Sequence, residues 1–339
     1  MSRIEHPIDE NRLSNYLSQH IPEFNGPLTA TKFAGGQSNP TYHIKAASGD
    51  YVLRRKPVGT LLPSAHAVDR EFLVLSALVN TEVPVAKTYH LCEDTSIIGS
   101  MFYLMEYVDG RVLWDPALPK ETTQNRRQIY AEMNRVLATL HSVNTDKVGL
   151  SAYGKPGNYF ERQVSRWTMQ YKASETSTLP EMDALIEWLN QNTPKDDGRV
   201  SLVHGDFRID NMMFDNKSNK VIALMDWELS TLGHPFADLA YQCMQWRIPR
   251  EGLVPGLHGL DYQALGIPTE QEYVAMYCER MGLDGIKNWN FYMAFSIFRL
   301  AAILQGVKKR GLDGNASSEK AVAMGEMVLP LAKMGAALI

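Results

Sequence analysis

The chain has 339 residues, of which 45% are hydrophobic and 21% are charged, and its formal net charge is −4. This length is sufficient for two compact units with a large core. The charge balance lacks the basic excess that is typical of nucleic-acid-binding proteins. No apolar run reaches the roughly 18–20 residues of a membrane span, and the first residues lack the apolar core of a signal peptide. The three cysteines form no metal or redox spacing. We therefore expect a cytoplasmic protein that binds neither nucleic acid nor membrane.

The first part of the chain is rich in predicted strands. Helical spacing over residues 8–20 precedes strand-like runs at 28–33, 41–44 and 51–55, which together predict an antiparallel meander. A helix and two further strands complete this part, at 64–79, 84–92 and 101–108. The turn after the first strand contains Gly35 and Gly36, whose backbone can approach an anion closely. Most Gly-Gly turns only reverse the chain, so both interpretations stay open at this point.

The rest of the chain is mostly helical by its apolar spacing. The expected helices lie at 120–142, 159–173, 180–192, 269–281, 288–310 and 317–336, with another that is entered at 233–241. The change from strands to helices predicts two lobes, 1–109 and 110–339. A boundary between lobes is a common place for a ligand cleft.

One polar loop in the second lobe carries most of the candidate chemistry. An apolar run at 201–203 leads into His204, Gly205 and Asp206, and a hairpin with strands at 212–215 and 221–226 follows. Because a hairpin brings its ends together, we expect Asn211 and Asp226 to lie side by side, with Asp206 close to both. Carboxylate and amide oxygens of this kind suit Mg²⁺ rather than zinc.

These pieces resemble a known family. The pattern His-Gly-Asp-x-x-x-x-Asn, a hairpin and Asp-Trp, behind a Gly-Gly-x-Ser-Asn turn and a strand–helix Arg/Glu pair, is similar to the aminoglycoside phosphotransferase and choline kinase-like family. The resemblance runs from about Leu28 to about Arg310. It implies an α+β, bilobal protein kinase-like fold, in which a small antiparallel sheet lobe with one main helix binds nucleotide. The larger, mostly helical lobe would carry the catalytic loop, metal site and substrate pocket.

A narrower resemblance concerns three short runs. The sequences at 33–42, 51–57 and 163–167 look like the phosphotransferase-like domains that are fused to, or encoded beside, acyl-CoA dehydrogenases. This resemblance implies a functional link to an acyl-CoA dehydrogenase. By analogy it also implies an acceptor that is a hydroxylated acyl or other catabolic intermediate.

The resemblance assigns roles to the residues of the polar loop. Phosphoryl transfer requires positioning, charge neutralisation and one carboxylate that accepts the proton of the acceptor hydroxyl. Asp206 matches that catalytic Asp, and Arg208 would steady the γ-phosphate. Asn211 and Asp226 match the Mg²⁺ ligands. His204 and Asp238 would brace the loop from behind.

A second group of residues matches the nucleotide site, for ATP or alternatively GTP. These residues are Gly35, Gly36, Gln37, Ser38, Asn39, Arg54, Glu71, Glu106 and Val108. Arg54 stands where the family usually has a Lys that binds the α- and β-phosphates, and it would pair with Glu71. Arg keeps the positive charge but changes the geometry of phosphate binding. Glu106 and Val108 would present hinge backbone to the adenine. Gly205 replaces the Arg that senses a phosphorylated loop in protein kinases, which favours a small-molecule substrate.

The acceptor side of the pocket is less defined. Its candidate residues are aromatic or cationic and lie on the predicted helices: Arg166, Trp167, Tyr241 and Arg299. Such side chains form pockets, but they also pack in cores, so both interpretations stay open. The net charge of −4 gives no sign of the dense acidic surface that a polycationic drug would need. The sequence thus predicts an ATP- and Mg²⁺-dependent phosphotransferase acting on a small-molecule hydroxyl; the alternatives are a nucleotide-binding pseudokinase module and, less favoured, a protein kinase.

Overall fold

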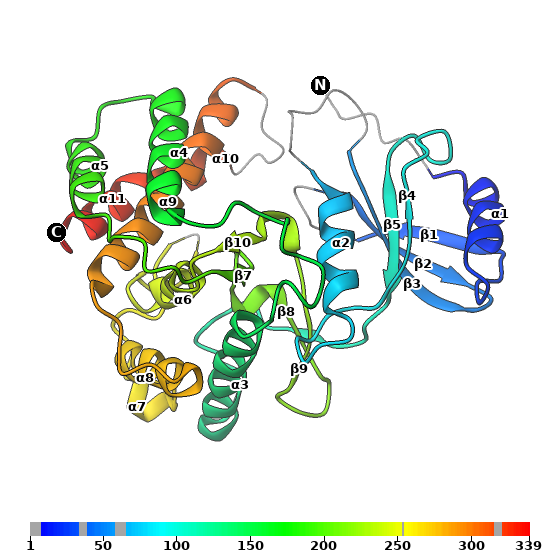
Figure 1. The fold of residues 1–339 in the computed structure, drawn as a ribbon, viewed down its shortest axis with the longest axis horizontal. Coiled ribbons are helices and arrows are strands. Elements are labelled where there is room, and N and C mark those ends of the chain that lie inside the picture. The colour runs from blue at the N-terminus through cyan, green and yellow to red at the C-terminus, as the bar shows by residue number, and fades with distance from the viewer. Residues whose placement is uncertain (1–7, 34–38, 58–65, 253, 315–320) are drawn as a thin grey trace. The chain divides into compact units, whose positions relative to one another are not determined.

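The computed structural model describes residues 8–33, 39–57, 66–252, 254–314 and 321–339 (Figure 1). The chain divides into two compact units, one of residues 1–111 and 222–228 and the other of residues 112–221 and 229–339. The segment 222–228 therefore returns to the N-terminal unit, a return that the predicted ranges 1–109 and 110–339 did not contain. It is attached there by Leu224, whose N–H donates to the carbonyl of Pro84 at 2.8 Å. The roles assigned to the two ranges stay predictions.

A five-stranded sheet in the order β1-β2-β3-β5-β4 forms the centre of the N-terminal unit. All its neighbouring strands are antiparallel, as the meander predicted. The strands are β1 (Leu28–Lys32), β2 (Thr41–Ala46), β3 (Gly49–Arg55), β4 (Thr88–Cys92) and β5 (Phe102–Glu106). Successive side chains of a strand point to opposite faces. The paired residues Leu53 and Leu104 therefore face one side of the sheet, and the next pair, Arg54 and Tyr103, faces the other.

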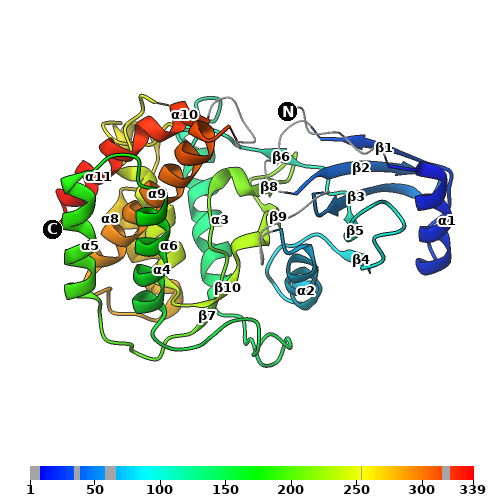
Figure 2. The same cartoon turned by 90° about the horizontal axis from the view of Figure 1, so that it is seen from above.

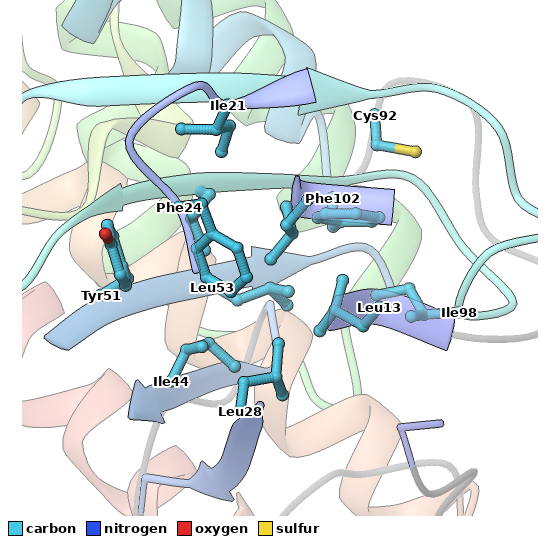
Figure 3. Close-up of a cluster of buried hydrophobic side chains, with 12 residues drawn as sticks. Leu13, Ile21, Phe24, Leu28, Ile44, Tyr51, Leu53, Cys92, Ile98 and Phe102 are labelled. Carbon is cyan, nitrogen blue, oxygen red and sulfur yellow. The ribbon is translucent and has the colours of Figure 1, made fainter. Parts of the chain in front are cut away.

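Two helices cover the two faces of this sheet. Helix α1 (Glu10–His20) places Leu13 and Leu17 in a buried cluster with Leu53 and Leu104, part of which Figure 3 shows. Helix α2 (Val68–Leu78) packs against β4 and β5 and carries the buried Glu71 toward Arg54. The apolar face thus forms the core of the unit, and the opposite face carries the charged groups.

The second unit is mostly helical. Its main helices are α3 (Thr123–His141), α4 (Tyr159–Ser174), α5 (Pro180–Asn192), α6 (Phe236–Cys243), α7 (Tyr262–Leu265), α8 (Glu270–Met281), α9 (Trp289–Leu312), α10 (Ala321–Met324) and α11 (Val328–Ala336). Its short strands are β7 (Ser201–Val203), β8 (Met212–Phe214) and β10 (Thr231–Gly233), while β6 (Arg111–Val112) and β9 (Val221–Leu224) lie where the chain passes between the units. The predicted hairpin is present, with β8 and β9 as neighbours.

Helix α9 is the central helix of this unit. It packs against α4, α5, α6, α10 and α11, and Figure 2 shows it within this group. By length and composition α9 is also the one helix among the described residues that is apolar enough to cross a membrane. However, 78% of its most apolar window is buried inside the structure, which is the pattern of a core helix.

The predicted helix over residues 317–336 is wrong in one respect. The described part of this segment is interrupted by a 3₁₀ turn, Gly325–Met327, between α10 and α11. Gly325 lies so close to α9 that a Cβ atom there would be 2.5 Å from the Cβ of Lys308. The turn therefore lets the chain pass tightly over α9, a tertiary contact that apolar spacing does not reveal.

Candidate active site

The polar loop begins directly after β7, which pairs with β10. Gly205 adopts a φ of +85°, in the left-handed region that glycine enters readily. A Cβ atom at this position would lie 2.6 Å from the carbonyl oxygen of Leu229. The loop therefore packs against the segment that precedes β10, and only glycine permits this close approach.

Asp238, in the first turn of α6, binds the backbone of the polar loop. Its side chain is 1% exposed, and its two oxygens accept the backbone N–H groups of His204 at 2.6 Å and Gly205 at 2.8 Å. His141 Nε2 lies 3.4 Å from the same carboxylate. Burial alone would raise the pKa of Asp238, but the hydrogen bonds and nearby histidines outweigh it and hold the pKa below its usual value. The loop is thus built on a buried carboxylate.

His204 contributes a second brace. It is fully buried, and its ring Nδ1 accepts the backbone N–H of Asp206 at 3.2 Å. This ring contact holds the peptide of Asp206 without reaching the solvent. The predicted role of His204 is to brace the loop through its ring, and this contact is of that kind.

Asp206 is held on both sides by neutral donors. Asn211 Nδ2 donates to the Asp206 carboxylate and to the Asp206 backbone carbonyl, both at 2.9 Å. The hydroxyl of Tyr241 also hydrogen-bonds to the carboxylate; burial, followed by the charge of Asp206, raises the pKa of Tyr241, so this hydroxyl stays a donor. Because the Asn211 amide uses its nitrogen here, its oxygen is the atom that can ligate a cation. The structure brings Asp206 and Asn211 together as predicted; the proximity of Asn211 to Asp226 stays a prediction.

Arg208 forms a two-pronged ion pair with Asp210. Its Nε donates to Asp210 Oδ1 at 2.9 Å, and its second terminal nitrogen binds the other carboxylate oxygen. Asp210 therefore fixes the guanidinium close to Asp206. The role of Arg208 toward the γ-phosphate stays a prediction.

Arg54 lies among three carboxylates in the N-terminal unit. Its Nε is 2.7 Å from Glu71, and its Nη2 is 2.6 Å from Asp226 and 3.9 Å from Glu228. Burial alone would lower the pKa of Arg54, but these carboxylates more than compensate and raise it. The predicted pairing with Glu71 is present. The contact with Asp226 was not predicted, and neither was Glu228, although it follows Asp226 closely in the sequence.

Glu71 is 1% exposed and fully engaged. Besides Arg54, it accepts Asn39 Nδ2 at 2.8 Å and the Tyr103 hydroxyl at 3.1 Å. Burial nevertheless raises the pKa of Glu71 above its usual value. Asn39 is thereby tied to α2 at the end of the predicted glycine-rich turn, whose Gly35, Gly36, Gln37 and Ser38 lie outside the described residues.

Asp226 itself has an unusual backbone. Its φ is +63°, in the left-handed region that residues other than glycine rarely occupy. Residues held in such conformations cluster at active sites and switch regions. The conformation directs its carboxylate to Arg54.

The predicted hinge residues lie at the end of β5, whose last residue is Glu106, and just beyond it. The N–H of Glu106 donates to the carbonyl of Lys87 at 2.8 Å, so this group is engaged within the sheet. Val108 lies just beyond the strand. The adenine contacts of both residues stay predictions.

An aromatic pair lies on the face of the sheet that carries Arg54, and sequence reasoning did not select it. His43 is the strand partner of Val52, which is two residues before Arg54 and therefore on the same face. The ring of Tyr107 lies 4.7 Å from the ring of His43. The period-two alternation of β2 and β3 is the signal that could have found this surface.

Arg299, a predicted substrate residue, contacts the polar loop. It is 6% exposed, and its guanidinium carbon lies 5.5 Å from the Trp167 ring and 5.3 Å from the Tyr241 ring. Its Nη2 donates to the carbonyl of Gly205 at 2.7 Å. Arg166 is exposed, and its guanidinium carbon lies 5.7 Å from the centre of the Trp167 ring. Direct substrate contact by these four candidates stays a prediction.

A cavity of about 410 Å³ opens beside Asp206, within the helical unit. Its polar lining consists of Asp206, Arg208, Asp210, Tyr241, Gln242 and Gln245. The rest of the lining is apolar: Trp114, Pro116, Ile209, Leu229, Met244, Ile248, Val254, Pro255, Leu300, Ile303, Leu304, Val307 and Met324. Trp114 is 75% exposed, which is exceptional for its size. The cavity thus combines the carboxylate of Asp206, the predicted catalytic residue, with an apolar wall.

Comparison with known proteins agrees with this arrangement. The family model described as the phosphotransferase enzyme family matches residues 29–273. A crystal structure of a candidate aminoglycoside phosphotransferase from Ralstonia eutropha JMP134 is 49% identical, with a TM-score of 0.90 and 98% coverage of both chains. Mouse acyl-CoA dehydrogenase family member 10 is 50% identical over 329 residues, which are 96% of this chain and 31% of the mouse protein. The chain therefore spans about a third of that relative.

A more distant structure shows the fold alone. Aminoglycoside phosphotransferase APH(4)-Ia, solved with AMP-PNP and hygromycin B, is 13% identical, with a TM-score of 0.61 and 96% and 98% coverage of this chain and that one. The predicted α+β, protein kinase-like fold is confirmed. From the family model and the Ralstonia structure together, the chain belongs to the phosphotransferase enzyme family.

Proposed function

We propose that this protein transfers the γ-phosphoryl group of ATP, with Mg²⁺, to a hydroxyl group of a small molecule. The observation that carries the proposal is the environment of Asp206, which Asn211, Tyr241 and His204 hold at the polar end of a cavity of about 410 Å³. A cavity of this size suits a small molecule rather than a protein segment. Related phosphotransferases bind a nucleotide analogue together with a hydroxyl-bearing compound.

The residues suggest a direct transfer. Asp206 accepts the proton of the acceptor hydroxyl as the acceptor oxygen forms its bond to the γ-phosphorus. The bond between that phosphorus and the β–γ bridging oxygen breaks, and ADP leaves with the bridging oxygen. Arg208 lies on the same loop and is positioned by Asp210 to offset charge on the phosphoryl oxygens. The neutral donors from Asn211 and Tyr241 keep the Asp206 carboxylate oriented without supplying a competing cation.

The donor chemistry of this chain fits Mg²⁺. The oxygen of the Asn211 amide and the Asp226 carboxylate are hard ligands, and among the described residues no group of three or more His, Cys, Asp or Glu side chains offers another metal site. The two would hold the ion together with phosphate oxygens and water. When bound, Mg²⁺ neutralises charge on the transferred phosphoryl group. Arg54 would exchange its contact with Asp226 for the nucleotide phosphates.

The nucleotide would be bound by the N-terminal unit. Arg54 is the cation, and Glu71 positions it. The rings of His43, which is half-buried, and Tyr107, which is exposed, offer a surface on which a purine can stack. We propose ATP as the nucleotide, with GTP as the alternative. Glu106 and Val108 would supply the hinge backbone.

The acceptor is proposed to carry an apolar chain. Most of the cavity wall is apolar, and its two carboxylates include Asp210, which is already paired with Arg208. A polycationic aminoglycoside would find little compensation there, whereas a hydroxylated acyl chain would bury apolar surface. The relation to acyl-CoA dehydrogenase family members supports a hydroxylated acyl or related catabolic intermediate and a functional link to such an enzyme.

The test is ATP consumption with Mg²⁺ across a panel of hydroxylated small molecules, including hydroxyacyl compounds and aminoglycosides. The proposal predicts turnover with at least one hydroxyacyl compound. Nucleotide binding without turnover across the panel would instead support the alternative, a pseudokinase-like regulatory module. The contact between Arg54 and Asp226 motivates that alternative, because it occupies a proposed metal ligand.

Replacing Arg54 should weaken nucleotide binding. The Arg54→Met variant loses a charge-assisted contact of about 1.5–3 kcal/mol, so we expect the Kd for ATP to rise roughly tenfold to hundredfold. It should also unfold more easily, because Glu71 is left buried without its cation. Isothermal titration with ATP measures the effect. Lys56→Met, which removes a more exposed cation paired with Asp69, is the control; equal affinities for both variants would contradict the role of Arg54.

A further inference from the structure

The cavity of about 410 Å³ has an aliphatic wall along one face of α9. Four residues of this helix line it: Leu300, Ile303, Leu304 and Val307. Their spacing of three and four positions places them on one face of the helix. Leu300, Ile303 and Val307 are half-buried, although residues 291–299 of the same helix are all buried. This core helix thus leaves a strip of aliphatic surface open to the cavity.

One end of this wall lies next to the polar loop. Arg299 precedes Leu300 in α9, and its Nη2 donates to the carbonyl of Gly205 at 2.7 Å. Gly205 is the residue before Asp206, whose side chain lines the cavity. The end of the wall that begins at Leu300 is therefore the end beside the proposed catalytic carboxylate.

The opposite end of the wall lies next to α10. Met324, the last residue of α10, lines the same cavity and is half-buried. The next residue, Gly325, is so close to α9 that a Cβ atom there would lie 2.5 Å from the Cβ of Lys308. Because Lys308 directly follows Val307, the side chains of Val307 and Met324 form the end of the wall that is farther from the polar loop.

The length of the wall follows from helix geometry. Val307 follows Leu300 by seven positions. With a rise of about 1.5 Å per residue, the two lie about 10 Å apart along the helix axis. A saturated chain with ordinary C–C bonds and angles spans that distance with roughly eight carbons. The wall therefore offers an extended alkyl chain a continuous apolar contact that begins at the polar loop.

We propose that this wall orients the acceptor and selects its chain length. The hydroxyl lies at Asp206, and an unbranched alkyl segment of roughly eight carbons runs from Leu300 to Val307 and Met324. The identity of this occupant as the phosphoryl acceptor rests on the proposed function. The inference adds a direction, a shape and a length to the apolar acceptor. Each methylene that the wall covers should strengthen binding about threefold to fourfold, and methylenes beyond its far end should add less.

The test uses the full chain and four alcohols: hexanol, octanol, decanol and the ring compound cyclooctanol. Binding is measured by titration calorimetry without nucleotide, so that turnover is not required. The wild-type protein should bind octanol about tenfold more tightly than hexanol, whereas decanol should gain at most about twofold over octanol. Cyclooctanol should bind about tenfold more weakly than octanol, because a ring cannot extend along the wall and covers fewer methylenes.

Substitutions at the two ends of the wall should have different effects. Val307→Gln removes apolar surface at the far end, so it should weaken octanol about tenfold and hexanol less than about twofold. Met324→Gln, on a different helix, should show the same pattern and provides an independent measurement if Val307→Gln does not fold. Leu300→Ala removes surface that every chain passes, so it should weaken hexanol and octanol alike. Val322→Gln changes an exposed residue of α10 that does not line the cavity; as the matched control, it should leave all affinities unchanged.

The outcomes separate this inference from the proposed function. Absence of binding, equal affinities for hexanol and octanol, or equal affinities for octanol and cyclooctanol would overturn the inference. So would a gain from octanol to decanol as large as that from hexanol to octanol, or a length preference that survives in both Val307→Gln and Met324→Gln. A preference in which only Leu300→Ala discriminates against the longer chain would overturn the proposed direction. A length preference that depends on the far end supports the inference even if no alcohol is phosphorylated, in which case the proposed function alone fails.

Discussion

The Asp206→Asn variant should lose phosphoryl transfer and keep nucleotide binding. The amide cannot accept the proton of the acceptor hydroxyl, and positioned general bases contribute roughly 10²–10⁴-fold to rate. Asn211 can still donate to the side-chain oxygen that remains, so the loop should keep its conformation. The expected result is a fall in kcat of about that size, with the Kd for ATP within about twofold of wild type because the proposed nucleotide contacts are unchanged.

The measurement pairs steady-state turnover with titration calorimetry for ATP. Asp284→Asn, an exposed aspartate outside the cavity beside Asp206, is the matched control and should retain full kcat. Retention of wild-type kcat in Asp206→Asn would reject the assignment of Asp206 as the base. A loss of ATP binding together with kcat would point to general damage in place of a missing base.

The Asp238→Ala variant should be the most destabilising change at the site. It removes the acceptor for the N–H groups of His204 and Gly205, in a position that is 1% exposed. Each buried donor left unpaired costs about 1–3 kcal/mol. Denaturation by urea should show this loss, and kcat should fall as well because the loop that carries Asp206 is no longer fixed. Stability equal to wild type would show that water replaces the carboxylate.

The stability contributed by Asp238 should also depend on pH. Its pKa in the folded protein lies below the usual value that it has when unfolded. Its contribution is therefore present above that usual value and is lost as the pH falls through the folded-state pKa. In urea denaturation from neutral to acidic pH, Asp238→Asn should lose less stability than wild type, whereas the exposed Asp284→Asn should follow wild type. Parallel pH profiles for wild type and Asp238→Asn would contradict this linkage.

Local patterns in the sequence predicted much of this molecule. Apolar periodicity located the meander and most helices, and the hairpin was placed by its polar turn. The spacing of Asp206 and Asn211 was sufficient to predict their contact, because only a short loop separates them. The Arg54–Glu71 pair followed from the family resemblance, and the structure contains it.

The features that were missed depend on packing between distant segments. Arg54 meets Asp226 across 172 positions of sequence, and no local period encodes that contact. The break between α10 and α11 arises where Gly325 passes over α9. These are tertiary properties of the side chains.

The return of residues 222–228 to the N-terminal unit has a consequence for synthesis on the ribosome. When Arg111 emerges, the sheet and α2 are complete, but Asp226 and Glu228 are still far from being made. At that stage Glu71 is available to pair with Arg54. The carboxylate of Asp226, which lies next to Nη2 of Arg54 in the folded chain, has not yet been synthesised. The N-terminal unit can thus be completed only after residue 228 has been translated. By then the segments that form α3, α4 and α5 have already been translated. Folding of this chain cannot proceed strictly from the first unit to the second, and a fragment ending at Arg111 should be less stable than the same unit within the whole protein.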